Sequence, residues 1–198
     1  MLGLPVSIRK VLLIRCAGGI ELFHLAYQKS MQQNNNIKII AIDPGTKEMG
    51  VAMFQGQELI YHGVKTIKKR KYPHEILKEA RKFLLRLIKD FNPQALVIEK
   101  TFFASNRNIA MLNVLADEIK AVAKRKGIQV ISFAPSTVKK YICKDGRAEK
   151  REVAKVVISK YPELKVYLTQ DRKWKEDYWL NVFDAVALGM MALVKRKN

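Results

Sequence analysis

The chain has 198 residues, of which 37 are Lys or Arg and 18 are Asp or Glu, so its formal charge at pH 7 is +19. This length suits one α/β domain rather than two, and a hydrophobic content of 48% excludes a disordered basic tail. The charge disfavours cationic partners and predicts a polyanion such as nucleic acid, without indicating any chemistry.

The first 36 residues are expected to be an extension, and residues 37–198 to form the folded domain. Residues 1–30 are basic at the front and nearly lack acids, as in a transit peptide, but we favour a start of translation at Met31. Cys16 and Cys143 have no metal-ligand spacing or disulfide framework, which indicates a reducing compartment such as the cytoplasm. No apolar run approaches the roughly 20 residues of a membrane span, and the helices are expected to be amphipathic.

The first part of the folded region is expected to form an antiparallel meander, with strands at residues 37–42, 50–54 and 58–65. The first of these is a continuous apolar, β-branched run, as in a buried central strand, and it stops at Asp43 before a Pro-Gly turn. A basic run at residues 65–71 follows. It is typical either of a solvated loop or of an edge that contacts phosphates.

The second part alternates helices with strands. The expected strands are residues 95–98 and 128–133, and the expected helices are residues 75–90, 108–126, 136–143, 150–160 and 174–195. The right-handed crossover rule makes the later strands parallel, whereas the stretch before the last helix has no regular pattern. The predicted fold class is therefore α/β, with a central mixed five-stranded sheet flanked by helices.

Three carboxylates stand where a metal site could use them. Asp43 follows the first strand, Glu99 follows the fourth, and Asp184 lies on the last helix. Neighbouring parallel strands present their carboxyl ends on one side of a sheet, the usual place for a ligand crevice. Oxygen ligands favour Mg²⁺ or Mn²⁺, and a pair of such ions can activate a water and stabilise a leaving oxygen. Each acid alone is equally typical of a strand-end cap or a surface charge.

Four strings add a more specific signal: AIDPGTKEMGVAMF, ALVIEKTFFASNRNIAML, APSTVKKYICKDGRAEKREVAK and FDAVALGM. In this order they resemble the successive motifs of RuvC-type Holliday junction resolvases, from about residue 37 to the C-terminus. The resemblance implies a ribonuclease H-like fold. It also implies a homodimeric Mg²⁺-dependent endonuclease, with two ions per active site and Mn²⁺ as a substitute, that resolves four-way DNA junctions by paired symmetric nicks in recombination and repair.

Carried over to this sequence, the resemblance implies that Asp43, Glu99 and Asp184 are metal-binding catalytic acids. The fourth metal ligand of the family lies three residues before the last acid, which is one helical turn away. That position is Asn181 here, whereas the family usually has Asp or His, and an uncharged amide should bind a metal less tightly. Lys150 matches the active-site lysine, which would stabilise charge developing on the scissile phosphate. As one lysine among many, it could equally be a solvated surface charge.

The resemblance also implies contacts with DNA. An aromatic residue at the Phe102 position stacks on bases at the junction centre. The candidate DNA-binding residues are Phe102, Asn106, Arg107, Lys139, Lys140, Lys144, Arg147 and Arg151. Residues 111–123 would form the dimer interface, although their apolar pattern is equally typical of a core helix. A branch-migration helicase is a further partner that the resemblance allows without requiring it.

Three alternatives remain at this stage. Because IDPGT also resembles the phosphate loop of actin-like ATPases and sugar kinases, the chain could be a fragment of such an enzyme, although its length argues against a second lobe. It could instead be a junction-binding protein that has lost catalysis through Asn181. Finally, an intact site could cut forks, flaps or RNA-containing hybrids rather than four-way junctions.

Overall fold

The computed structural model describes residues 37–67, 72–100, 107–170 and 172–195. The expected N-terminal extension therefore lies outside the described residues. So do most of the basic run and the segment that contains Phe102 and Asn106.

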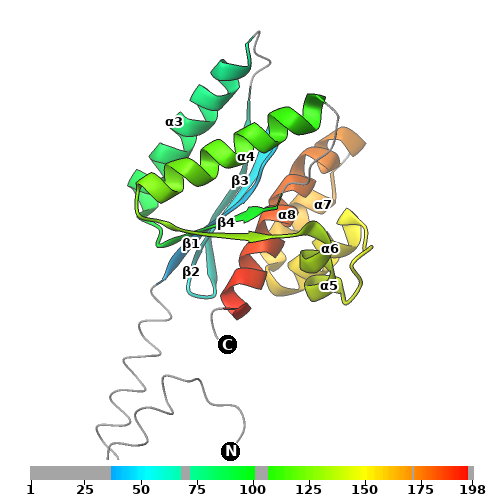
Figure 1. Cartoon of the computed structure of the whole chain (residues 1–198). Coiled ribbons are helices and arrows are strands. Elements are labelled where there is room, and N and C mark those ends of the chain that lie inside the picture. Colours follow the sequence, from blue (N-terminus) through cyan, green and yellow to red (C-terminus); the bar gives the residue numbers. More distant parts are fainter. Residues whose placement is uncertain (1–36, 68–71, 101–106, 171, 196–198) are drawn as a thin grey trace, which may run out of the picture.

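A mixed five-stranded sheet forms the centre of the molecule (Figure 1). Its strands are β1 (Lys38–Asp43), β2 (Glu48–Gln55), β3 (Glu58–Thr66), β4 (Ala95–Glu99) and β5 (Gln129–Phe133), in the order β3-β2-β1-β4-β5. Strand β2 is antiparallel to both β1 and β3, whereas β4 is parallel to both β1 and β5. The expected meander followed by parallel strands is confirmed.

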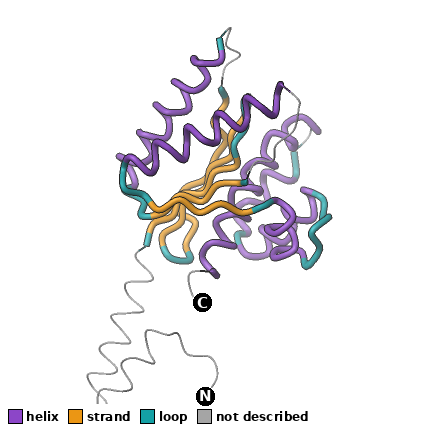
Figure 2. The backbone as a smooth tube through the Cα atoms, viewed as in Figure 1, coloured by secondary structure: helices purple, strands orange, loops and turns teal. Residues whose placement is uncertain are grey.

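Helices cover both faces of the sheet (Figures 1 and 2). Helices α3 (Pro73–Phe91) and α4 (Arg107–Arg125) pack on one face, and α5 (Pro135–Cys143), α6 (Lys150–Lys160) and α8 (Lys173–Lys195) pack on the other. Residues 39–42 of β1 and 95–98 of β4 are all apolar and fully buried, because neither face of these strands meets water.

The stretch expected to be irregular contains two short helical turns, η1 (Pro162–Leu164) and α7 (Lys165–Leu168). Leu164 is fully buried and anchors them to the core on the α8 side of the sheet. The prediction of an irregular stretch was wrong because each turn is too short for a helical period to be visible in the sequence.

Helix α8 also departs from the expected amphipathic pattern. On length and composition alone it could cross a membrane, but 67% of its apolar window is buried within the fold. Its described neighbours include the sheet, α5, α6 and α7, so most of its circumference is covered by protein. An all-round apolar composition is what such a core helix requires.

Two glycines allow α8 to lie close against β2. A Cβ atom at Gly50 of β2 would collide with the backbone carbonyl of Asn181, and one at Gly189 of α8 would collide with the ring of Phe54. Gly50 is the register partner of Asp43 across the β1–β2 ladder. The close approach therefore brings the Asn181 turn of α8 to the end of the sheet where β1 stops.

Candidate active site

The structure brings the three predicted acids together at one end of the sheet. Asp43 and Glu99 are the last residues of β1 and β4, which are adjacent and parallel with Ile42 opposite Ile98. By alternation along each strand, both side chains lie on the face that α8 covers. Helix α8 presents Asp184 to the same point, so the expected carboxylate cluster is formed by three elements that are distant in sequence.

The charged forms of the clustered carboxylates are disfavoured where these side chains lie. Burial, reinforced by repulsion from Asp184 and Glu99, raises the pKa of Asp43 well above its ordinary value. Burial and the charge of Asp184 raise the pKa of Glu99 to about 7, although Lys150 and Lys139 act in the opposite direction. A cation bound between these side chains would relieve both the repulsion and the desolvation.

Lys150 is the cation that the protein itself supplies. Its Nζ atom lies 2.8 Å from the Asp184 Oδ2 atom, at the first turn of α6. Burial acts to lower the pKa of Lys150, but Asp184, Asp43 and Glu99 together raise it above its ordinary value. A positive side chain at a helix N-terminus opposes the helix dipole, so the carboxylates are needed to offset that placement.

Asn181 lies one helical turn before Asp184, as predicted. Its Nδ2 amide donates to the Tyr178 carbonyl oxygen at 3.0 Å and to the Glu48 Oε2 atom at 3.4 Å. With the amino group engaged in this way, the side-chain oxygen is the part of Asn181 left to act as an acceptor or a ligand.

Glu48 is a residue that sequence reasoning missed. It begins β2, and the lack of a side chain at Gly45 lets the preceding turn close onto the Glu48 backbone. The carboxylate of Glu48 thereby reaches Asn181 on α8. The available signal was its position inside the first motif, five residues after Asp43.

The donor set fits a hard divalent cation. Carboxylate and amide oxygens suit Mg²⁺ or Mn²⁺ rather than zinc, and their mutual repulsion would be relieved by such an ion. Over the described ranges, no three His, Cys, Asp or Glu side chains are grouped tightly enough to hold one ion as they stand. Side-chain movement, including release of Asp184 by Lys150, would therefore accompany binding.

The predicted DNA-binding residues are distributed around this point. Lys139 lines a small cavity of about 30 Å³ together with Glu99 and Asp184. Lys140, Lys144 and Arg147 are exposed on α5 and on the connection to α6. Phe102 and Asn106 lie outside the described residues, and Arg107 is described only as the first residue of α4.

Arg151 has a partner that the sequence did not suggest. Its guanidinium forms a two-pronged ion pair with the carboxylate of Glu176, with N–O distances of 2.5 and 2.6 Å. Glu176 is only 6% exposed, and its pKa is lowered by this hydrogen-bonded pair. The pair joins the start of α6 to the start of α8, the two helices that carry Lys150 and Asp184. A DNA contact by Arg151 stays a prediction.

Comparison with known proteins gives the family of the chain. The sequence model of the crossover junction endodeoxyribonuclease RuvC family matches residues 39–170. The chain belongs to the RuvC family. It is 33% identical over 124 residues to RuvC of Rubrobacter xylanophilus, covering 60% of this chain and 69% of that one. It is 29% identical over 158 residues to RuvC of Alkaliphilus metalliredigens, covering 77% and 90% respectively.

A solved structure confirms the fold. Thermus thermophilus RuvC in complex with a Holliday junction substrate matches with a TM-score of 0.63 and 20% sequence identity, covering 81% of this chain and 96% of that one. The ribonuclease H-like architecture expected from the motifs is thus confirmed. Membership of the RuvC family also replaces the kinase-fragment interpretation of the IDPGT string.

Proposed function

We propose that this RuvC-family chain is a metal-dependent endonuclease that nicks four-way DNA junctions in recombination and repair. The observation that carries the proposal is the convergence of Asp43, Glu99 and Asp184, with raised pKa values at the first two and Lys150 beside the third. Two further facts support it: the +19 charge of the chain, and the names of its relatives, which are crossover junction endodeoxyribonucleases.

In this proposal Asp43, Glu99, Asp184 and Asn181 hold two Mg²⁺ ions, for which Mn²⁺ can substitute. When bound, the ions supply the positive charge that makes a water nucleophilic and stabilises the leaving oxygen. Glu48 and the Tyr178 carbonyl orient the Asn181 amide by accepting its two N–H bonds. The half-buried position of the carboxylates limits the screening of their charge by bulk water.

Lys150 has two successive roles in this scheme. Without a metal, its ammonium group neutralises Asp184 at 2.8 Å. Once the carboxylates are neutralised by cations, the same group is available to stabilise charge on the scissile phosphate. Lys139, which lines the cavity beside Glu99, would contact an adjoining phosphate oxygen in this scheme.

Paired symmetric nicks require two active sites, so we propose a homodimer. We also propose that the protein is located in the cytoplasm. The proposed interface on α4 is only partly available, because Leu115, Ile119 and Val122 are buried against the sheet. Val114, which is 50% exposed, and the half-buried Ile109, Met111 and Leu112 are among the apolar side chains left on this helix for a partner. Sedimentation analysis of the purified protein tests the dimer directly, and a branch-migration helicase stays a further proposed partner.

A second function is favoured by one observation. Position 181 offers a neutral amide rather than a carboxylate, which weakens the attraction for a cation. A protein with such a site could bind junctions without cutting them.

One experiment separates the two functions. The purified protein is incubated with a four-way junction, a fork and plain duplex in Mg²⁺, Mn²⁺ or chelator, beside the Asp43→Asn variant. Symmetric metal-dependent nicks in the junction alone, absent from the variant, would support the endonuclease. Tight junction binding with no nicks in either metal would instead support the binding protein, and nicks in the fork would widen the substrate class.

A further inference from the structure

We propose that a groove between β3 and α3 binds the phosphates of one DNA arm beside the carboxylate site, an inference that rests on the proposed function. The groove has a volume of about 600 Å³ and is lined on α3 by Lys78, Lys82, Phe83 and Arg86. Lys65 of β3 and Glu79 of α3 form an ion pair at its wall. Lys65 is the first residue of the basic run at 65–71, and the groove shares no residue with the carboxylate site.

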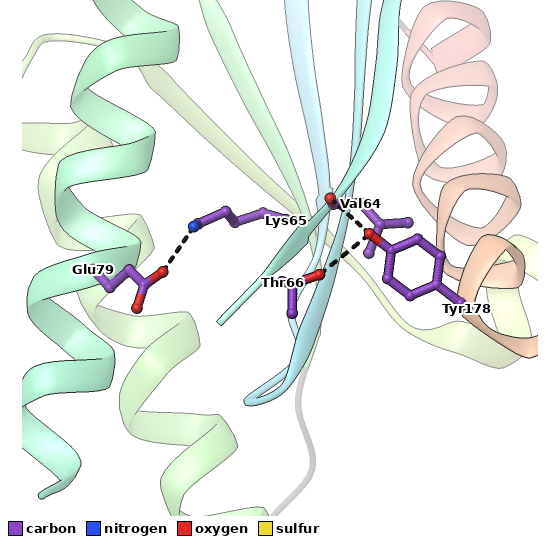
Figure 3. Close-up of polar contacts among 5 residues, drawn as sticks. All are labelled: Val64, Lys65, Thr66, Glu79 and Tyr178. Carbon is purple, nitrogen blue, oxygen red and sulfur yellow. Dashed lines mark hydrogen bonds and ion pairs between the residues drawn. The ribbon is translucent and has the colours of Figure 1, made fainter. Parts of the chain in front are cut away.

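The acidic side chains in the groove are already engaged. Figure 3 shows Glu79 directed at Lys65, with 2.7 Å between the Oε1 and Nζ atoms. Glu75 accepts a hydrogen bond from the backbone N–H of Tyr72 at 3.3 Å, which closes the start of α3. Glu79 is therefore offset by Lys65, and Glu75 is the one carboxylate lining the groove that is set against the three remaining cations on α3.

The basic side chains, by contrast, are left facing solvent. Lys78 and Lys82 have no ion-pair partner among the described residues. Arg86 lies 3.5 Å from Asp90, but both side chains are well exposed, and such surface pairs hold an arginine weakly. The groove thus presents uncompensated positive charge to a ligand.

The spacing of these cations suits an extended polyanion. Lys78, Lys82 and Arg86 follow one another at intervals of four residues, so they form a stripe along one face of α3. At a rise of about 1.5 Å per residue the stripe is about 12 Å long. Duplex DNA carries about one negative charge per 1.7 Å of axis, so about seven phosphates pass along this length.

The groove lies at the same end of the sheet as the carboxylates. Asp43 pairs with Gly50 of β2, which in turn pairs with Val64 of β3, so the three residues form one row across the strands. Two strand spacings place Val64 about 10 Å from Asp43. Lys65 follows Val64 and points to the opposite face, towards α3.

The end of β3 is held from both faces, as Figure 3 shows. On one face Lys65 binds Glu79 of α3. On the other, the Tyr178 hydroxyl contacts the Val64 carbonyl oxygen at 3.3 Å and the Thr66 hydroxyl at 3.2 Å, and the backbone carbonyl of Tyr178 accepts from Asn181. The groove and the carboxylate site are therefore fixed relative to each other. This continuity favours DNA over an acidic protein as the occupant.

The test compares two charge-matched triple variants of the full chain. The groove variant is Lys78→Gln/Lys82→Gln/Arg86→Gln. The control, Lys124→Gln/Lys126→Gln/Lys165→Gln, removes three exposed cations that lie off α3, at the end of α4, just beyond it and on α7. A third variant, Lys78→Arg/Lys82→Arg/Arg86→Lys, keeps the charge. Affinity for a four-way junction is measured in chelator over a range of salt concentrations.

In the groove variant, we expect the slope of log affinity against log salt to fall by about 0.9 for each phosphate that the protein no longer neutralises. The control and the charge-keeping variant should retain the wild-type slope. A junction with uncharged methylphosphonates along one arm should weaken binding by the wild type and by the control, with little further weakening in the groove variant.

Equal slopes and equal methylphosphonate effects for the groove variant and the control would overturn the inference and leave the groove to an acidic partner. A cleavage assay on the wild type shows whether the groove inference has failed or the proposed endonuclease function has failed. A wild type that cuts junctions while the groove variant behaves like the control defeats only the groove. A wild type that never cuts, combined with a reduced salt slope in the groove variant, defeats the endonuclease and keeps the groove.

Discussion

The two faces of the sheet use charge in opposite ways at the same end of the molecule. On the α8 face, Asp43 and Glu99 are half-buried, and desolvation is the largest cause of their raised pKa values. On the α3 face, Lys78, Lys82 and Arg86 remain in solvent. A few desolvated charges can hold an ion and affect reactivity strongly, whereas many solvated charges provide affinity that depends on salt.

The largest expected effect comes from removing a carboxylate on the α8 face. Asp43→Asn should reduce single-turnover cleavage of a junction by at least about a hundredfold to a thousandfold, because one preorganised charge is removed from the reacting centre. Its junction affinity in chelator should be retained or increased, since a negative charge has been removed. The groove variant should show the reverse: weakened binding with a near-normal rate at saturating protein. Cleavage and binding assays on both variants check this, and a parallel loss of both properties in each would contradict the separation.

The second prediction concerns stability as a function of pH. The folded-state pKa of Glu99, about 7, exceeds its ordinary value of 4.5, so the folded protein keeps a proton that the unfolded chain loses. The stabilisation that this proton provides should therefore be fully present below about pH 4.5. In chelator, the free energy of unfolding should decline by about 2–3 kcal/mol as pH rises through 7.

Denaturant unfolding at pH 5 and pH 8 measures this decline. Glu99→Gln should flatten it, because the replaced side chain no longer titrates, and Mg²⁺ should restore the wild type at pH 8 but affect the variant less. The same pH dependence in wild type and variant would show that Glu99 is not the titrating group.

A third prediction strengthens the metal site instead of weakening it. Asn181→Asp should tighten Mn²⁺ binding about tenfold, because a charged ligand replaces a neutral one. Without metal the variant should be less stable than the wild type, since the new carboxylate lies near Glu48 and lacks the N–H that now donates to it. Calorimetric titration with Mn²⁺ and melting in chelator measure the two effects. Unchanged Mn²⁺ affinity would place position 181 outside the metal site.

The smallest expected effect concerns the link between α6 and α8. Arg151→Met should lower the melting temperature by several degrees, because it leaves the nearly buried Glu176 carboxylate without its partner. The double variant Arg151→Met/Glu176→Leu should recover much of that decrease. A salt-slope change in Arg151→Met without a change in melting would instead indicate the predicted DNA contact.

The sequence was sufficient to predict the sheet and the acids, because both follow from local patterns. The apolar run of β1 and the turn after Asp43 placed a carboxylate at a strand end, and the ordered motifs connected it with Glu99 and Asp184. Pairings between distant segments were not visible. Glu48 and Glu176 meet Asn181 and Arg151 across the fold, and no spacing in the sequence links them. Only an acid at position 176, on the buried stripe that continues at Leu180, hinted at a paired charge.

The close seating of α8 at Gly50 and Gly189 has a consequence for biosynthesis. A ribosome releases β1 and β4, with Asp43 and Glu99, well before it completes α8. Until α8 docks through these two glycines, the carboxylate cluster lacks Asp184 and the ordered Asn181 amide. The carboxylate site is therefore complete only after the last helix of the described fold has docked. A nascent or truncated chain that lacks this helix has basic surface but an incomplete carboxylate site.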